Sequence, residues 1–289
     1  MGQIRDYLCS YDSSADITLG IIENLNLPIP EVYQKSEYIT ELAIKVQEKE
    51  KDLLCRIPFC HTLEGEALGG NVNFGNNKYG PRAKDYICKN LQEVLELPPI
   101  DVTKGRIAEN LKAAKQLKSE GKEVVFMLSG PFTILNMLIN SAELFRGFRK
   151  EPEIFVKVLK KLGNEVLKIM SAALESGVNN FSYADSAGAV NIIGPKMAEL
   201  VVEEFTYDFV KGMEKISDEN TLIFLCPKTA LALIGMSKAE FVPLKTEGEI
   251  TYTEACLKNR GKVKFVGQTC IKSGMKLLKN SLLQEVRIE

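Results

Sequence analysis

Apolar positions along the chain follow two different spacings, one typical of helices and one typical of buried strands. EYITELAIKVQEKEKDLL (37–54) and PEIFVKVLKKLGNEVLKIMSAALESG (152–177) repeat apolar residues at helical spacing, with charges on the other face. EVVFMLSG (123–130) and TLIFLC (221–226) are short, almost continuous apolar runs, which are typical of strands covered on both faces. Residues 1–50 are predicted to form a helical and polar extension.

From residue 104 onward, strand and helix patterns alternate. One strand is expected before this region, in LLCRIPFC (53–60). Within it, further strands are expected in VNNFSYADSAG (178–188), AEFVPL (239–244) and VKFVGQTC (263–270). Further helices are expected in residues 103–122, 131–140, 195–218 and 252–262. Repeated strand-then-helix units indicate a parallel sheet covered by helices. The chain has no GxGxxG or GxxxxGK[ST] motif, so nucleotide-binding variants lose support. We therefore predict one domain over residues 1–289, an α/β TIM-type (β/α)8 barrel on which the N-terminal extension packs.

Composition excludes several classes of function. Lys and Arg number 37 and Asp and Glu 38, so no net field attracts nucleic acid or an anionic membrane surface. The absence of Trp argues against a platform for stacking bases. The start MGQIRDYLCSYDSS lacks the layout of a signal peptide, and the chain has no apolar run long enough to span a bilayer. A cytoplasmic location is expected, and a homo-oligomer is left open.

Cysteine and histidine are used unevenly. The seven cysteines are scattered and odd in number, with no CxxC pair, which suits free thiols or a metal site and excludes a zinc ribbon. His61 is the only histidine. Few kinds of catalytic site can be built with a single imidazole. The positions of His61 and the cysteines relative to the predicted strands are therefore the best guide to a functional site.

The residues that follow the predicted strands are the main candidates for chemistry, because barrel enzymes act at the carboxyl ends of their strands. These ends are Cys60-His61-Thr62-Leu63-Glu64, Ser129-Gly130-Pro131, Tyr183-Ala184-Asp185-Ser186, Cys226-Pro227-Lys228 and Gly267-Gln268-Thr269-Cys270. Three of the five carry a cysteine, so Cys60, Cys226 and Cys270 would ring one mouth. Cysteine also packs commonly as a small hydrophobic residue. Cys226 and Cys270 are the better pair of metal ligands, since two thiolates suit zinc.

The remaining candidates at these ends are acids, wall residues and polar groups. Asp185 would either orient a substrate or cap a helix, and Glu64 would either face the mouth or serve as a first-turn acid. Tyr183 is expected in the wall. We take Cys60, Glu64, Gly130, Pro131, Tyr183, Lys228 and Gln268 as substrate-binding candidates, and His61 and Asp185 as catalytic candidates.

Three of these segments carry a resemblance to a known family. RIPFCHTLEGEALGGNVNFG, SGPFTILNMLI and FSYADSAGAVNIIGPKMAELVVEEFTYDFVKG resemble, in order, conserved segments of the uroporphyrinogen decarboxylase superfamily. Within it the chain looks most like the methylcobamide:thiol methyltransferases of the coenzyme M methyltransferase type. The likeness spans residues 30–275 and implies a TIM barrel.

The resemblance argues against porphyrinogen decarboxylation. The catalytic aspartate of the decarboxylases has its place taken by His61, and their active-site tyrosine has its place taken by Met137. Their C-terminal G-H-G motif and N-terminal arginine cluster have no counterpart here.

The methyltransferase branch implies a zinc ion held by H-x-C and a later cysteine. Cys226 matches the first cysteine and Cys270 the later one, but Phe224 stands at the place of the family histidine. The third ligand stays open, and His61 is the only imidazole. The implied reaction moves a methyl group between the corrinoid of a partner protein and a thiol or similar small molecule, with zinc activating the thiol.

Two alternatives remain. The first is a metal-free barrel that binds a corrinoid or tetrapyrrole, or that partners an active paralogue. The second is a decarboxylase or lyase acting on a small substrate, with His61 as its acid or base.

Overall fold

Five parallel strands form the centre of the fold. The structure is a computed structural model that describes residues 4–7, 9 and 14–289. The five strands are β1 (Leu54–Ile57), β4 (Glu123–Ser129), β5 (Asn180–Ala184), β6 (Leu222–Leu225) and β8 (Phe265–Val266), hydrogen-bonded in that order. Each is a neighbour of the next one along this series, as expected for repeated strand–helix units. The predicted parallel α/β arrangement is confirmed for these strands.

The sheet continues into an antiparallel pair that the sequence pattern did not predict. β7 (Ala239–Lys245) pairs along its whole length with β9 (Leu282–Ile288), and β9 joins the pair to β8, also antiparallel. AEFVPL is therefore a strand, but the expectation that it joins a parallel sheet was wrong. Its side chains are a mixture of sheltered and exposed ones, and antiparallel strands tolerate that mixture because one face meets water.

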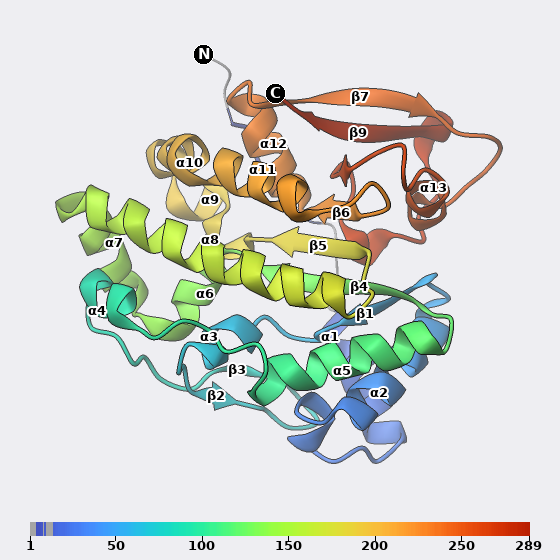
Figure 1. Ribbon diagram of the computed structural model, residues 1–289, viewed down its shortest axis with the longest axis horizontal. Coiled ribbons are helices and arrows are strands. Elements are labelled where there is room, and N and C mark those ends of the chain that lie inside the picture. Colours follow the sequence, from blue (N-terminus) through green and yellow to red (C-terminus); the bar gives the residue numbers. More distant parts are fainter. Residues whose placement is uncertain (1–3, 8, 10–13) are drawn as a thin grey trace.

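Helices cover the sheet (Figure 1). They are α1 (Ser14–Asn24), α2 (Ser36–Glu50), α3 (Leu63–Ala67), α4 (Leu91–Glu96), α5 (Gly105–Ser119), α6 (Pro131–Leu138), α7 (Ser141–Lys150), α8 (Pro152–Glu175), α9 (Val190–Ile193), α10 (Pro195–Val201), α11 (Tyr207–Ile216), α12 (Pro227–Gly235) and α13 (Tyr252–Lys258). A π-helical turn, η3 (Val202–Thr206), joins α10 to α11, and 3-10 turns lie at η1 (Glu31–Tyr33), η2 (Ser186–Gly188), η4 (Ile271–Ser273) and η5 (Lys279–Ser281). A small separate ladder pairs β2 (Val72–Asn73) with β3 (Arg82–Ala83).

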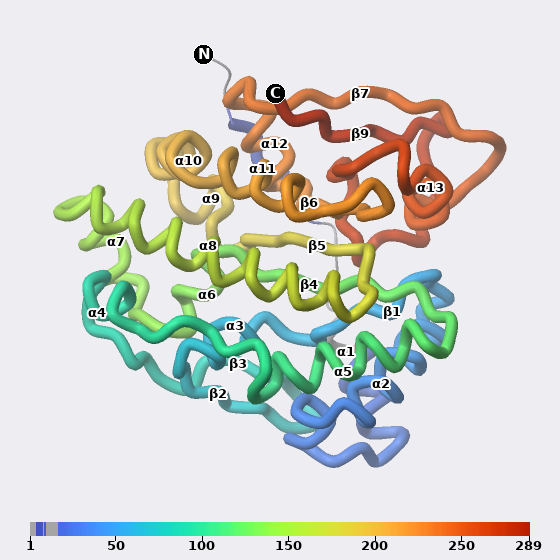
Figure 2. Tube along the Cα trace, viewed as in Figure 1, coloured from blue at the N-terminus to red at the C-terminus, as the bar shows by residue number. Residues whose placement is uncertain are grey.

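The helical N-terminal extension is present in its described part. α2 packs against α5 and β1, and the tube in Figure 2 places the blue α2 at the end of the molecule opposite the orange and red pair β7 and β9. That the extension and barrel form one domain stays a prediction.

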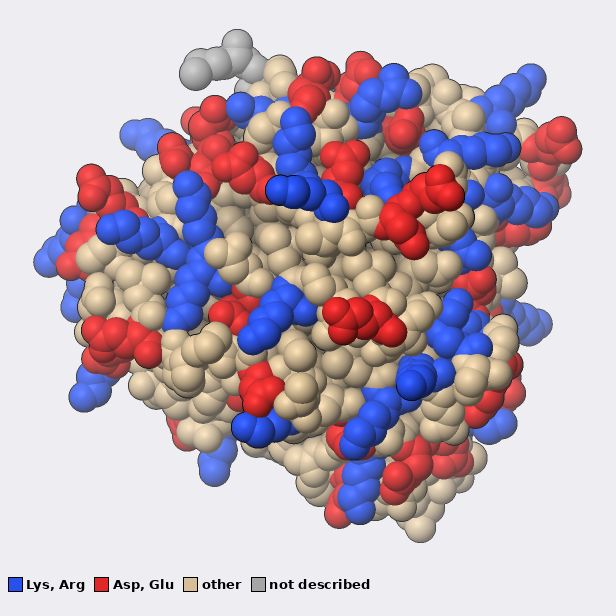
Figure 3. Space-filling view, viewed as in Figure 1, with Lys and Arg blue, Asp and Glu red and all other residues tan. Residues whose placement is uncertain are grey.

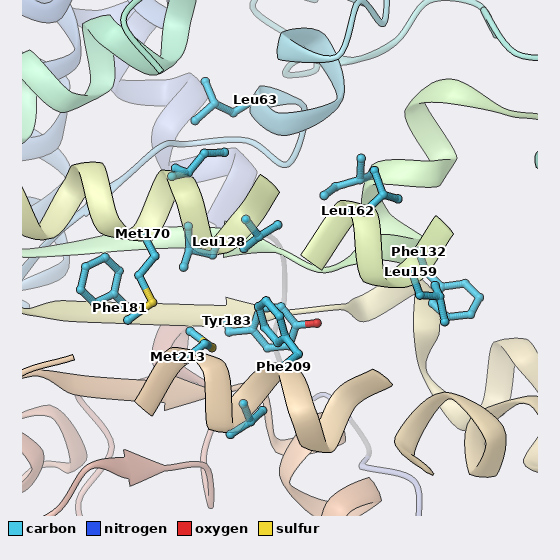
Figure 4. Close-up of a cluster of buried hydrophobic side chains, with 14 of the residues drawn as sticks. Leu63, Leu128, Phe132, Leu159, Leu162, Met170, Phe181, Tyr183, Phe209 and Met213 are labelled. Carbon is cyan, nitrogen blue, oxygen red and sulfur yellow. The ribbon is translucent and has the colours of Figure 1, made fainter. Parts of the chain in front are cut away.

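The two faces of the parallel strands face two apolar cores. Phe126 and Leu128 of β4 belong to the larger core, and Val125 and Met127 to the other, as the two-residue repeat of a strand requires. Figure 4 shows the larger core, where Tyr183 of β5 lies against Phe209 of α11. Because the strands are anchored on both faces, their carboxyl ends are held in fixed positions.

Charges of both signs are interspersed on the face seen in Figure 3, in keeping with a formal net charge of −1. None of the helices in the described ranges combines the length and apolar character needed to cross a bilayer.

Candidate functional site

The predicted strand ends lie along one edge of the sheet. Register pairs Ser129 with Ala184, Tyr183 with Leu225, and Phe224 with Val266, so each strand stops at nearly the same level as its neighbour. The segments that follow these strands therefore meet at this edge, where the sequence placed the chemistry.

A cavity at this edge, here called the His61 cavity, gathers residues from the loop after β1, from α6, from η2 and from the turn after β8. Its polar and charged lining comprises Thr18, Tyr33, Cys60, His61, Thr62, Arg82, Thr133, Asn136, Ser186 and Lys272. Among the residues that the structure describes, the lining holds two cations and no acid. A small anionic molecule is the ligand that this charge pattern favours.

His61 is held at the wall of this cavity by the end of β4. Its Nδ1 lies 3.4 Å from Oγ of Ser129. Burial and, to a smaller extent, the charge of Lys272 together lower the pKa of His61 to about 4. The imidazole is therefore neutral at pH 7 and available as a proton acceptor or hydrogen-bond donor.

Glu64 lies behind His61 rather than in the cavity. Its side chain is 0% exposed, its Oε1 accepts the N–H of Ser129 at 2.7 Å, and its Oε2 is buried without a partner. Burial raises the pKa of this carboxyl against the opposing effect of its hydrogen bonds from Ser129. A direct substrate contact, as the sequence suggested, does not follow from this position.

Cys60 accepts a hydrogen bond from a buried arginine that the sequence did not single out. Nη2 of Arg106 lies 2.9 Å from Sγ of Cys60, and Nη1 donates to Thr62 at 3.1 Å and to Glu66 at 2.8 Å. Nε of Arg106 donates to the carbonyl of Tyr33 at 2.9 Å. One guanidinium thus fastens α5 to the loop that carries Cys60 and His61.

Asp185 caps helix α6. Its carboxylate accepts the N–H groups of Phe132 and Thr133 at 3.0 and 2.9 Å, and the Thr133 hydroxyl at 3.0 Å. The pKa of Asp185 is raised to about 6 by burial, against the effect of these hydrogen bonds. Gly130 leaves room for this cap, because a Cβ there would lie 2.3 Å from Cβ of Asp185. Pro131 occupies the first turn of α6, where its missing N–H costs little.

Replacement of Asp185 by Ala is expected to destabilise the fold by about 2 kcal/mol, because it leaves two N–H groups at the start of α6 without their acceptor. Urea unfolding followed by circular dichroism measures the change. Asp208→Ala, at an exposed acid in the first turn of α11, is the matched control and should change stability by less than about 0.5 kcal/mol. Equal effects of the two substitutions would contradict the assignment.

A second, smaller cavity lies beside the first, on the other side of η2. Tyr183, Asp185, Lys228 and the N-terminal residues Ile4, Arg5 and Asp6 line it. Nζ of Lys228 lies 3.4 Å from Asp6 and 3.2 Å from Oδ1 of Asn191. Tyr183 is 1% exposed and packs as a wall residue. Of the predicted substrate contacts, Cys60 lines the His61 cavity, and Tyr183 and Lys228 line this smaller one.

The zinc ligand set implied by the resemblance is incomplete. Cys270 and Cys9 both act on the pKa of Cys226, and Cys9 also acts on that of Cys270. Across residues 4–7, 9 and 14–289, however, no three His, Cys, Asp or Glu side chains are placed to hold a metal ion. Phe224, at the family histidine position, is 1% exposed in the core against Tyr252. The residues present therefore do not fit a zinc ion.

Burial also raises the pKa of the two thiols, to about 11 for Cys226. Both are neutral at pH 7, and none of the seven cysteines is in a disulfide.

Gln268 has its amide engaged within the protein. Its Nε2 donates to the carbonyl of Leu282 at 3.2 Å and its Oε1 accepts the N–H of Gln284, so it fastens β9 to the end of β8.

Sequence reasoning missed Lys272 and Arg106, which reach the site from a turn and a helix outside the predicted strand ends. The basic residue two places after Cys270 was the one available signal for Lys272.

Comparisons with known proteins agree with this arrangement. The methylcobamide:CoM methyltransferase MtaA of Methanosarcina barkeri is 24% identical over 248 residues, which cover 84% of this chain and 71% of that protein. The methylcobamide:CoM methyltransferase MtbA of Methanosarcina acetivorans is 25% identical over 186 residues, covering 63% of this chain and 54% of that protein.

A solved structure described as a methyltransferase from Methanosarcina mazei superposes with a TM-score of 0.65 at 19% identity, covering 81% of this chain and 68% of that one. At this identity it supports the fold alone, and the predicted α/β TIM-type class is confirmed. The family model for uroporphyrinogen decarboxylase (URO-D) matches residues 22–268. The chain therefore belongs to the uroporphyrinogen decarboxylase family.

Proposed function

We propose that this chain is a methyltransferase that moves a methyl group between a methylcobamide, carried by a corrinoid protein, and a small anionic thiol. The observation that carries the proposal is the likeness to methylcobamide:CoM methyltransferases over as much as 84% of the chain. The His61 cavity supports it, because Arg82 and Lys272 in its lining suit an anionic acceptor.

The reaction requires a thiolate to attack the methyl carbon. The carbon–sulfur bond forms as the cobalt–carbon bond breaks, the electron pair stays on cobalt, and the thiol proton must leave beforehand. The chain's own residues would bind the anionic end through Lys272 and Arg82 and would place the sulfur beside His61. A cation near the acceptor also stabilises the thiolate, since it favours the charged form.

The test uses methylcobalamin with the purified full chain and three thiols of different charge: 2-mercaptoethanesulfonate, 2-mercaptoethanol and cysteamine. Conversion of methylcobalamin to cob(I)alamin, followed by absorbance under anaerobic conditions, should be fastest with the anionic thiol. Lys272→Met should lower kcat/KM for that thiol about tenfold and change the neutral thiol little, because only the former loses a charge contact. No demethylation by the folded protein with any thiol would overturn the proposal.

A second measurement, of zinc content, tests whether the reaction is assisted by zinc. Elemental analysis of protein purified without chelator is expected to find well below one equivalent of zinc in wild type and in Cys226→Ser. About one equivalent in wild type, lost in Cys226→Ser, would restore the zinc-assisted form of the reaction. Tight corrinoid binding without methyl transfer would instead favour the metal-free binding barrel.

A further inference from the structure

Residues 4–6 line the smaller cavity, at the carboxyl ends of β5 and β6. Ile4 is 9% exposed and belongs to the larger core, whereas α1, which follows in the chain, packs on α2. In Figure 1 this short blue segment lies beside α12, away from the blue helices α1 and α2. Oδ1 of Asp6 lies 3.4 Å from Nζ of Lys228 in α12. The segment therefore brings one apolar and one anionic side chain to the cavity.

The walls of the smaller cavity suit both of these groups. Lys228 supplies a cation, and Asn191 Oδ1 accepts from its Nζ at 3.2 Å, so the ammonium keeps a partner whether or not Asp6 is present. Asp185 also lines the cavity, but its oxygens accept the first N–H groups of α6. The position of Asp6 shows that a second carboxylate is accommodated there. Most of the remaining wall is apolar and comprises Val190, Ala198, Val201, Val202 and Ala232.

The contacts that the structure describes for this segment are weak enough to be exchanged for those of a ligand. The side chains of Lys228 and Asp6 are 18% and 28% exposed, so water screens their ion pair. Burial of Ile4 favours the bound segment, and the ordering of residues 4–7 opposes it with a free energy of the same order. The space left in the cavity is about 40 Å³, too little for an organic molecule. A ligand can therefore enter only by displacing the segment.

We propose that the smaller cavity is a binding site for a small carboxylate with an apolar chain, and that Ile4 and Asp6 occupy it in place of that ligand. The ligand's carboxylate would replace that of Asp6 on Lys228, and its chain would replace the side chain of Ile4. Cα atoms two residues apart are separated by at most about 7 Å, so a chain of about six carbons bridges the two positions. Hexanoate is therefore the probe. The proposal does not depend on methyl transfer.

Displacement of the segment can be followed by fluorescence, because the chain contains no tryptophan. Tyr7→Trp places a single indole next to Asp6. Acrylamide should quench this indole more strongly when hexanoate is added, since the segment leaves the cavity. Hexanol and hexylamine, which lack the carboxylate, should leave the quenching unchanged.

Competition between segment and ligand predicts opposite effects for the two partners of one ion pair. Equilibrium dialysis with radiolabelled hexanoate measures the affinity without a fluorescent reporter. Asp6→Asn should tighten hexanoate binding about threefold, because the segment competes less well. Lys228→Met should weaken it about fivefold, because the ligand loses its cation although the segment is released as well. A purely structural ion pair would give no such opposition.

Asp208→Asn and Lys262→Met, at exposed positions, are the matched controls and should bind hexanoate as wild type does. Circular dichroism checks that each variant is folded. Absence of saturable binding at millimolar hexanoate in both wild type and Asp6→Asn would overturn the proposal. So would equal affinities of Asp6→Asn and Lys228→Met, or binding without a rise in quenching, since hexanoate would then bind elsewhere. Methyl transfer is not measured here, so a failure of the proposed function leaves this result unaffected.

Discussion

Replacement of Arg106 by Met should destabilise the protein by about 3 kcal/mol, because four hydrogen bonds of one buried guanidinium are lost together. Arg106 is 6% exposed, so water does not replace the missing donors at Cys60, Thr62 and the carbonyl of Tyr33. Glu66 is 28% exposed and regains part of its hydration, which holds the loss below that of a fully buried ion pair. Met preserves most of the apolar volume, so the loss reports the polar contacts.

Arg106→Lys should fall between Met and wild type, since an ammonium keeps the charge but cannot reach four acceptors in a plane. Urea unfolding by circular dichroism gives the free energies, with the slope checked for each variant. Arg287→Met is the matched control, because Arg287 is 57% exposed and contacts acids only at the surface. A loss below about 1 kcal/mol for Arg106→Met would contradict the bracing role.

The core strands could be predicted from the sequence because their signal is local. EVVFMLSG and TLIFLC are apolar runs that bury both faces, and they appear as β4 and β6 within about one residue of the expected bounds. LLQEVRI at the C-terminus was missed, since its alternating pattern is that of a half-exposed strand and its partner β7 lies far back in the sequence.

The candidate site was predictable only in position. Strand ends located Cys60, His61 and Asp185 correctly at one edge, because parallel strands carry their carboxyl ends together. The direction in which a side chain points depends on the tertiary structure and could not be predicted from the sequence. Glu64 reaches inward to Ser129, and Gln268 is used to fasten β9. Arg106 lies on a helix whose sequence is that of an ordinary solvated one, and only the fold brings its guanidinium to Cys60.

His61 should make the protein less stable as the pH falls from about 6.5 to about 4. The pKa of an unfolded histidine is near 6.5, and that of folded His61 is about 4. In this window the unfolded chain binds a proton at His61 that the folded chain refuses, so the free energy of unfolding decreases with acid. Over the full window the loss amounts to about 3 kcal/mol, and above pH 7.5 the effect is absent because both states are neutral.

The comparison that isolates this loss is wild type against His61→Gln, with the unfolding free energy of each measured from pH 7.5 down to the edge of acid unfolding. Carboxyls such as Asp185, whose pKa of about 6 falls in the same window, titrate in both proteins and cancel in the difference. Gln is of similar size and carries no charge at any pH. The wild type should therefore lose stability relative to His61→Gln as the pH drops, and a difference independent of pH would mean that folded His61 titrates as it does in the unfolded chain. The sign matters for the site as well, because a ring that resists protonation in this way stays neutral at pH 7.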